Sequence, residues 1–238
     1  MVDTNINIIQ DTKTKIIDLL TPSGWAQHLR LFLKSSDMDT LLERLLKESQ
    51  EGRRFTPTMK DVFSAFTKCP FDKVKVVIIG QDPYPYYGVA DGLAFSCSKE
   101  KKPQSSLRYI FKAVEKTVYQ GCPTTQDPDL TRWADQGVLL LNSALTCQID
   151  KIGTHYDIWK DFIFNVLDAL NYKKASPIPF ILMGKEAQSF KPYISHPAIK
   201  VSHPASAAYQ KASEWDCGDC FNRVNTWLVD QGDKKIEW

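Results

Sequence analysis

The sequence has no apolar run that approaches the ~18 residues of a membrane-spanning helix, and its first residues, MVDTNINIIQDTKTK, lack the shape of a signal peptide. We therefore expect an intracellular protein of the cytoplasm or nucleus that is not secreted. There is also no internal repeat and no composition shift that would mark a domain boundary. The 238 residues are expected to form one domain at residues 21–238, preceded by a loosely attached arm at residues 1–20.

A strong charge of one sign is absent as well, because the net charge at pH 7 is only +2. This balance argues against a protein that binds nucleic acid by its overall field, but it allows an enzyme with a local basic groove. Six cysteines are scattered along the chain. The pair Cys217 and Cys220 has no second C-x-x-C or H-x-x-x-H pair to complete a zinc site, so we expect free thiols and no metal.

The sequence does contain short apolar runs of the kind found in strands that are buried on both faces. They lie at residues 76–79, 138–141, 178–183 and 199–201. Helical patterns stand between and after them. An alternation of strands and helices predicts an α/β fold, a single domain with a central four-stranded parallel sheet flanked by helices.

Helix starts can be predicted from polar residues that precede apolar stripes. Asp39 or Thr40 is the expected N-cap of a leucine-rich helix, and Ser105 and Ser106 are expected to cap an amphipathic helix. Asp219 is the expected cap of the last helix.

Polar side chains follow the strand ends, at Gln81, Asp82, Asn142 and His203, and a glycine turn follows at Gly184. Because the carboxyl ends of parallel strands share one edge of a sheet, these residues should converge on one crevice. Each residue alone has an ordinary structural explanation, such as a helix cap, a turn or a surface histidine. The combination favours a functional site.

Three motifs occur in order along the chain. They are GQDPY at residues 80–84 with GLAFS at 92–96, GVLLLN at 137–142, and His203-Pro204. Together they resemble the water-activating loop, the uracil-reading strand and the leucine loop of family 1 uracil-DNA glycosylases. The resemblance runs from about Trp25 to Trp238.

The resemblance implies a monofunctional enzyme of the uracil-DNA glycosylase fold. The enzyme would hydrolyse the N-glycosidic bond of deoxyuridine in DNA and leave an abasic site for base excision repair. Such enzymes extrude the base from the DNA. The resemblance implies two catalytic residues, Asp82 at the sugar and a neutral His203 at the departing base. No cofactor is implied.

It also implies a uracil pocket and a set of DNA contacts. Asn142 would pair with the polar edge of uracil, and Tyr84 would fill the space that a thymine methyl group needs. The residues implied to bind uracil are Gln81, Tyr84, Phe95 and Asn142. Those implied to contact DNA are Ser106, Gly184, Lys185, Pro204, Ala205, Ser206 and Ala207.

The sequence departs from the family pattern at four places, in a way similar to divergent viral or phage members. The family's proline-rich loop before Ser106 is reduced to KPQS at residues 102–105. Pro85 stands where the family continues with histidine, so the attacking water loses a customary partner. Lys185 follows Gly184 and adds a cation near phosphate. Residues 203–207, HPASA, lack the intercalating leucine. Duplex opening should therefore be weaker, and single-stranded DNA is expected to be the easier substrate.

Two alternatives stay open. Pro85 and the missing leucine would also fit a DNA-binding or partner-docking protein of the same fold with weak or no glycosylase activity. A third reading is an unrelated α/β hydrolase that acts on free nucleosides. The expected partners are uracil-containing DNA, single- or double-stranded, and a proteinaceous glycosylase inhibitor or a replication partner. The protein is expected to be a monomer.

Overall fold

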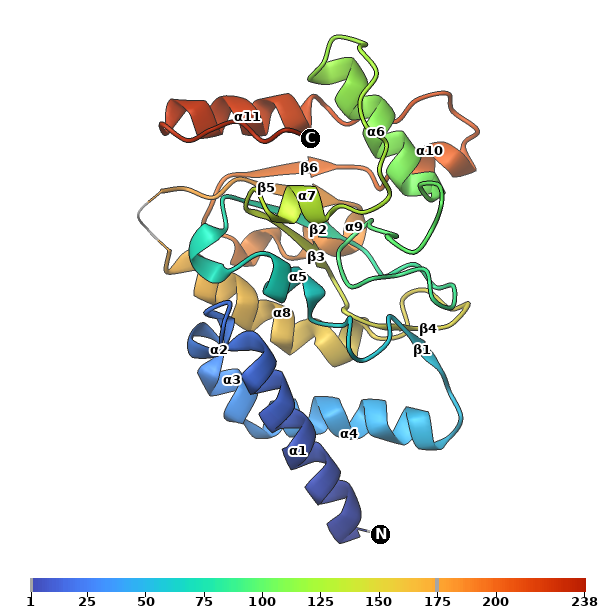
Figure 1. Ribbon diagram of the computed structural model, residues 1–238, viewed down its shortest axis with the longest axis vertical. Coiled ribbons are helices and arrows are strands. Elements are labelled where there is room, and N and C mark those ends of the chain that lie inside the picture. The colour runs from blue at the N-terminus through green and yellow to red at the C-terminus, as the bar shows by residue number, and fades with distance from the viewer. Residues whose placement is uncertain (1, 174–175) are drawn as a thin grey trace.

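A computed structural model describes residues 2–173 and 176–238, and a parallel sheet runs through its middle (Figure 1). The strands are β1 (Phe55–Thr56), β2 (Val76–Gly80), β3 (Val138–Asn142), β4 (Cys147–Gln148), β5 (Phe180–Met183) and β6 (Ala198–Val201). The helices are α1 (Val2–Leu20), α2 (Trp25–His28), α3 (Arg30–Lys34), α4 (Ser36–Gln50), α5 (Ser64–Lys68), α6 (Ser105–Thr117), α7 (Thr131–Ala134), α8 (Tyr156–Asn171), α9 (Lys185–Ser189), α10 (Ala205–Tyr209) and α11 (Cys220–Asp230). Two short 3-10 helices are η1 (Phe71–Lys73) and η2 (Lys191–Tyr193).

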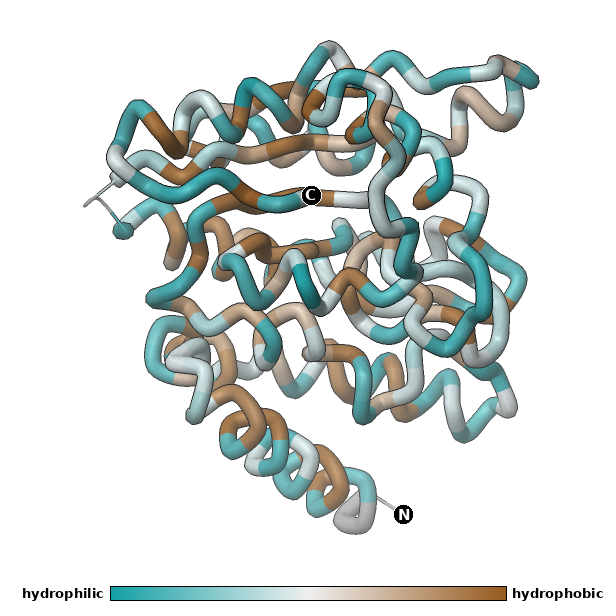
Figure 2. The backbone as a smooth tube through the Cα atoms, turned by 45° about the horizontal axis from the view of Figure 1, so that its top comes forward, coloured by the Kyte–Doolittle hydropathy of each residue, from teal (hydrophilic) through white to brown (hydrophobic). Residues whose placement is uncertain are grey.

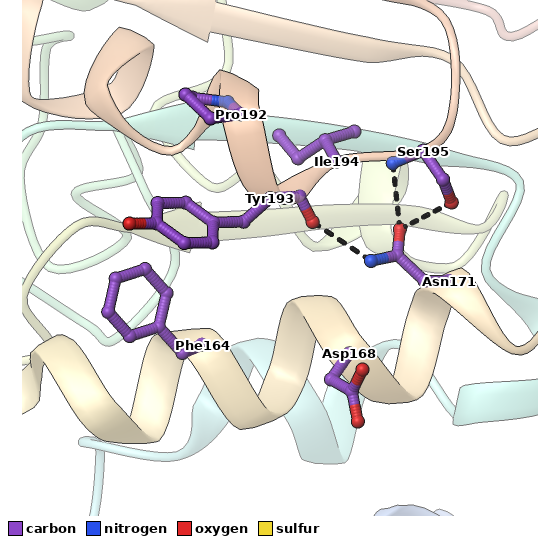
Figure 3. A pocket seen from close by; sticks show the side chains of 7 residues that line it. All are labelled: Phe164, Asp168, Asn171, Pro192, Tyr193, Ile194 and Ser195. Carbon is purple, nitrogen blue, oxygen red and sulfur yellow. Dashed lines mark hydrogen bonds between the residues drawn. The ribbon is translucent and has the colours of Figure 1, made fainter.

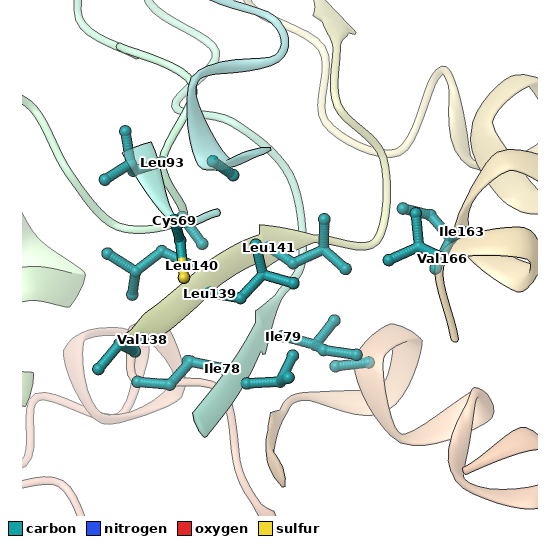
Figure 4. Close-up of a cluster of buried hydrophobic side chains, with 14 of the residues drawn as sticks. Cys69, Ile78, Ile79, Leu93, Val138, Leu139, Leu140, Leu141, Ile163 and Val166 are labelled. Atoms are coloured by element: carbon teal, nitrogen blue, oxygen red, sulfur yellow. The ribbon is translucent and has the colours of Figure 1, made fainter. Parts of the chain in front are cut away.

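The central sheet has the strand order β3-β2-β5-β6, and all three pairings are parallel. Every residue of β2, β3 and β5 is buried, which explains why these strands appear in the sequence as unbroken apolar runs (Figure 4). The predicted four-stranded parallel sheet is confirmed. The antiparallel pair β1–β4 was not predicted, because each of its strands has only two residues and leaves no pattern in the sequence.

Aromatic side chains fill the space on both sides of the sheet. On the side of α5 and α8, Phe63, Phe66 and Phe162 meet edge to face or tilted, with ring centroids 5.5 to 6.3 Å apart. On the side of α6 and α11, Trp133 packs edge to face against Phe111 and Trp238. Such geometry is favourable for buried rings. The two layers confirm the prediction of helices on both faces (Figure 1).

Residues 1–20 were expected to be a loosely attached arm, but residues 2–20 form the helix α1. Apolar and polar residues alternate along it (Figure 2). Its apolar face is buried at Ile9, Ile16 and Leu20. Lys13, whose side chain is only 8% exposed, forms a 2.6 Å ion pair with Asp39 of α4. The polar composition of this segment suggested loose attachment, but tertiary contacts anchor the helix to α4 and the core.

Two of the predicted helix caps are wrong. The N-cap of α4 is Ser35, whose hydroxyl accepts hydrogen bonds from the backbone N–H groups of Asp37 and Met38. Asp39 and Thr40 therefore lie inside the helix. The prediction placed the cap too late because it relied on the leucines from Leu41 onward, whereas the buried face of α4 begins at Met38.

At α6 the N-cap is Gln104, so Ser105 and Ser106 belong to the first turn and do not cap it. Asp219 does occupy the N-cap position of α11, but its side chain accepts no hydrogen bond from the helix backbone. Its carboxylate instead accepts one from the side chain of Asn222.

All six cysteines are free thiols, as predicted, and only Cys122 is exposed. Over residues 2–173 and 176–238, no helix combines the length and the apolar character needed to cross a bilayer.

The packing of α1 yields a stability prediction. Leu20 is fully buried, whereas its neighbour Leu19 is 42% exposed. We expect Leu20→Ala to lower the free energy of unfolding by about 2–5 kcal/mol, because it leaves a cavity in the core. Leu19→Ala should change it by less than about 1 kcal/mol. Urea denaturation followed by circular dichroism measures both, and equal effects would mean that α1 does not share the core.

Candidate active site

The carboxyl end of β2 meets that of β3 at Gly80, which lies opposite Asn142 in the parallel register. A Cβ atom at residue 80 would lie 2.8 Å from Asn142 Oδ1 and 3.0 Å from Cε2 of Phe95. The amide of Asn142 and the ring of Phe95 therefore close over the space that a side chain at Gly80 would occupy. A glycine is needed here because of this close approach.

Phe95 is held in a left-handed backbone conformation, with φ of 67°. Such a conformation is uncommon for a bulky residue and needs support from its surroundings. The buried carboxylate of Asp91 supplies it by accepting hydrogen bonds from the hydroxyl of Ser96 at 2.6 Å and the backbone N–H of Ser98 at 2.8 Å. The hydroxyl of Tyr84 donates to the carbonyl oxygen of Phe95 at 2.9 Å.

His203 follows β6 and lies beside this ring, with the two ring centroids 5.7 Å apart. Its Nδ1 accepts a hydrogen bond from the backbone N–H of Ala205 at 3.2 Å, so this nitrogen carries no proton. Burial lowers the pKa of His203 to about 4. The imidazole is therefore neutral near pH 7, and its Nε2–H is a hydrogen-bond donor.

Asp82 follows β2 and forms the anionic part of the site. Its Oδ2 accepts hydrogen bonds from the hydroxyl of Tyr156 at 2.7 Å and from the backbone N–H of Gly153 at 2.9 Å. Its Oδ1 is buried and has no partner among the described residues. Burial raises the pKa of Asp82, and the negative charge of Glu186 adds to this, while both hydrogen bonds act in the opposite direction.

Tyr156 contacts the predicted site residue Asp82, although the sequence does not single it out. It is the first residue of α8, and its neighbour His155 is fixed between the hydroxyl of Thr146 at 2.7 Å and the carboxylate of Glu48 at 3.1 Å. Pro85 indicated only that the attacking water loses a customary partner. No local pattern signals that a tyrosine more than 70 residues away would donate to the carboxylate.

The remaining predicted residues lie around the same edge. Gln81 is half-buried, and its carbonyl oxygen accepts from the backbone N–H of Ser143 at 3.0 Å. Gly184 packs closely on His203, since an added Cβ would lie 3.1 Å from the histidine Cβ. Lys185 is exposed at the start of α9, and Ser106 is buried in the first turn of α6.

The segment after His203 contains the last group of predicted DNA contacts. Pro204 is buried, Ala205 and Ser206 are half-buried, and Ala207 is only 4% exposed. Ala207 therefore faces the protein interior and offers no side chain to DNA. The large exposed side chain of α10 is Tyr209, at 83%.

A larger cavity, of about 550 Å³, lies away from this edge (Figure 3). It lies between α8 and the segment at η2, and none of the predicted functional residues lines it. The side chain of Asn171 there bonds to the carbonyl oxygen of Tyr193 and to the backbone N–H and hydroxyl of Ser195, so these polar groups satisfy one another. In the described part of the chain, no three His, Cys, Asp or Glu side chains are grouped so that they could hold a metal ion.

The fold and the site together define an α/β enzyme whose sheet edge presents a carboxylate, an amide, an aromatic ring and a neutral imidazole. Residues 66–228 match the model of the family described as "Uracil DNA glycosylase superfamily". The chain is 34% identical over 237 residues to the "Uracil-DNA glycosylase" of Acinetobacter baylyi, covering 98% of each. It is 33% identical over 233 residues to that of Caenorhabditis elegans, covering 96% of this chain and 81% of the other. This chain therefore belongs to the uracil DNA glycosylase superfamily.

Solved structures show the same fold. Mimivirus uracil-DNA glycosylase matches with a TM-score of 0.81 at 23% identity, covering 93% of this chain and 88% of that one. A variant of mimivirus UNG in complex with UGI matches with a TM-score of 0.81 at 24% identity, covering 93% and 90%.

The contact between Tyr156 and Asp82 yields a prediction that does not depend on activity. Tyr156→Phe removes a hydrogen bond that favours the charged carboxylate, so the pKa of Asp82 should rise further. Titration of the carboxyl groups by ¹³C NMR measures this shift. Tyr172→Phe, at a tyrosine that is 74% exposed, is the matched control and should leave the curve unchanged. An unaltered Asp82 titration in Tyr156→Phe would contradict the assigned contact.

Proposed function

We propose that this protein is a monofunctional uracil-DNA glycosylase that releases uracil from deoxyuridine in DNA and leaves an abasic site. Membership of the superfamily supports this activity. The observation that carries the proposal is the closure of Asn142 and Phe95 over Gly80, next to the neutral His203. Together these groups form a binding site for a flat base with a polar edge.

Asn142 is proposed to read the polar edge of uracil. Its side chain is buried and makes no hydrogen bond with any other described residue, so both amide atoms are available to a ligand. The amide oxygen accepts from uracil N3–H, and the amide nitrogen donates to O4. Cytosine presents the opposite pattern and would leave buried polar groups unpaired, which is a strong source of rejection.

Tyr84 and Phe95 are proposed to enclose the ring of the base. The hydrogen bond from Tyr84 to the carbonyl oxygen of Phe95 fixes the two aromatic residues relative to each other. Phe95 stacks on uracil, while Tyr84 occupies the position of a thymine 5-methyl group. Shape and hydrogen bonding therefore contribute separately to the selectivity for uracil.

Breaking the N-glycosidic bond creates positive charge on the sugar and negative charge on the departing base. The carboxylate of Asp82 stabilises the cationic sugar, and its Oδ1, which has no hydrogen-bond partner among the described residues, orients the attacking water. The hydroxyl of Tyr156 and the backbone N–H of Gly153 donate hydrogen bonds to Oδ2 and thereby fix the orientation of the carboxylate. Pro85, which stands where the family has histidine, has no side-chain hydrogen-bonding group that could help to do this. The Nε2–H of His203 donates to the uracil oxygen as its negative charge grows.

Single-stranded DNA is proposed to be the better substrate. A wedge residue must project from the protein to separate stacked bases. Ala207 is small and buried, so residues 203–207 provide no such wedge. A uracil that is already unpaired needs less energy to enter the site.

A proteinaceous inhibitor is a further proposed partner. The support is the mimivirus UNG variant, which was solved in complex with UGI and shares the fold at a TM-score of 0.81. The DNA-facing edge of this chain is the surface on which such an inhibitor would bind.

Asp82→Asn tests the proposed chemistry. The substitution keeps the shape but removes the negative charge, so uracil release should fall by at least about 100-fold. A single-stranded oligonucleotide with one deoxyuridine, cleaved by alkali after incubation, reports the release. Asp168→Asn, at an exposed residue of α8, is the control and should retain the wild-type rate. Wild-type release by Asp82→Asn would reject the mechanism and favour a binding protein of the same fold.

Tyr84→Ala tests the exclusion of thymine. Removal of the ring opens space for a 5-methyl group, so the variant should release thymine from ordinary DNA as well as uracil. Tyr84→Phe is the matched control, because it keeps the ring and loses only the hydrogen bond to Phe95. Gel assays of one oligonucleotide that contains deoxyuridine and one that contains only thymidine measure the ratio of thymine release to uracil release. If thymine is still rejected by Tyr84→Ala, another residue excludes the methyl group.

A further inference from the structure

A groove of about 370 Å³ opens between α6 and α10 and takes no part in the site described above. It is lined by Ser105, Arg108, Tyr109, Lys112 and Ala208. Arg108 and Lys112 are exposed and one helical turn apart, so they present two cations on the same face of α6.

Arg108 and Lys112 have no acidic partner in the described part of the chain. Within the described residues, neither Arg108 nor Lys112 takes part in an ion pair. The next lysine along the same face, Lys116, is different because it pairs with Glu214 at 2.5 Å. The positive charge of α6 is therefore neutralised at its far end and left free beside the groove.

The groove lies close to the proposed entrance for the base. α10 begins two residues after His203, and α6 and α10 lie side by side (Figure 1). The hydroxyl of Tyr109 donates to the carbonyl oxygen of Ala212 at 2.8 Å, which fixes α6 to the segment that follows α10. The cations therefore lie on the wall of the groove opposite α10, the helix that follows His203.

We propose that this groove binds a backbone phosphate of the DNA strand that carries the uracil. The inference rests on the proposed function and adds a site to it. Two unpaired cations and the hydroxyl of Ser105 match a phosphodiester, which carries one negative charge and several acceptor oxygens. The two charges add affinity for the strand beside the flipped nucleotide. They do so in a protein whose Ala207 is too small and too buried to separate stacked bases.

The test uses Arg108→Ala/Lys112→Ala and a single-stranded oligonucleotide of about 15 nucleotides with one deoxyuridine. Each phosphate contact to single-stranded DNA contributes about 0.7 to the slope of log affinity against log salt. The double variant should therefore lose about 1.4 from this slope, and its affinity near 0.1 M salt should fall by about 25-fold. Fluorescence anisotropy between about 50 and 200 mM NaCl measures both quantities.

Two further variants make the result specific. Lys116→Ala removes a cation of the same helix that Glu214 already neutralises, so its slope should stay near that of the wild type. Arg108→Lys/Lys112→Arg keeps both charges and should also keep the slope, which separates loss of charge from loss of folding. A wild-type slope in the alanine variant, or an equal loss in Lys116→Ala, would overturn the inference.

Failure of the proposed function has a different signature. In that case the wild-type protein releases no uracil from any oligonucleotide, whatever the salt concentration. If the wild type releases uracil and the alanine variant binds as tightly as the wild type, only the phosphate site is rejected. Loss of affinity with unchanged uracil release at saturating DNA supports the site.

Discussion

The absence of a side chain at Gly80 is the constraint on which the base-binding half of the site depends. The parallel ladder between β2 and β3 fixes Gly80 opposite Asn142, so neither residue can move away without breaking the sheet. A Cβ atom there would come within 3.0 Å of both the amide of Asn142 and the ring of Phe95. Because that atom is missing, the amide and the ring can lie close together and present two faces of one pocket.

The carboxylate half of the site depends on contacts between distant parts of the chain. Glu48 of α4 bonds to His155, and Tyr156, the next residue, donates to Asp82. The N-terminal helices therefore do more than cover the sheet. They hold in place the start of α8, from which the hydroxyl reaches the carboxylate. Glu48 is thereby connected to Asp82 through the consecutive residues His155 and Tyr156.

The sequence and the structure agree where a signal is local. The strands are visible as apolar runs, and the positions of Asp82, Asn142 and His203 could be predicted because each lies at or just after the end of a strand. Tyr156 could not be found, since its role arises from a contact across 74 residues of chain. The burial of α1 was missed for a similar reason, because it depends on packing between helices that the one-dimensional pattern does not contain. The cap at Ser35 is a local contact, and it was missed because the visible leucine stripe begins later in the helix.

Burial acts in opposite directions on the two proposed catalytic groups. It raises the pKa of Asp82, which the hydrogen bonds from Tyr156 and Gly153 counteract, and it lowers the pKa of His203 to about 4. In the proposed mechanism, a histidine this weakly basic donates a hydrogen bond to uracil without adding a full positive charge to the base-binding site. The proposed hydrogen bond from His203 then strengthens in the transition state, as negative charge grows on the uracil oxygen. The proposed phosphate site instead uses the cations Arg108 and Lys112, which line a groove separate from the catalytic groups.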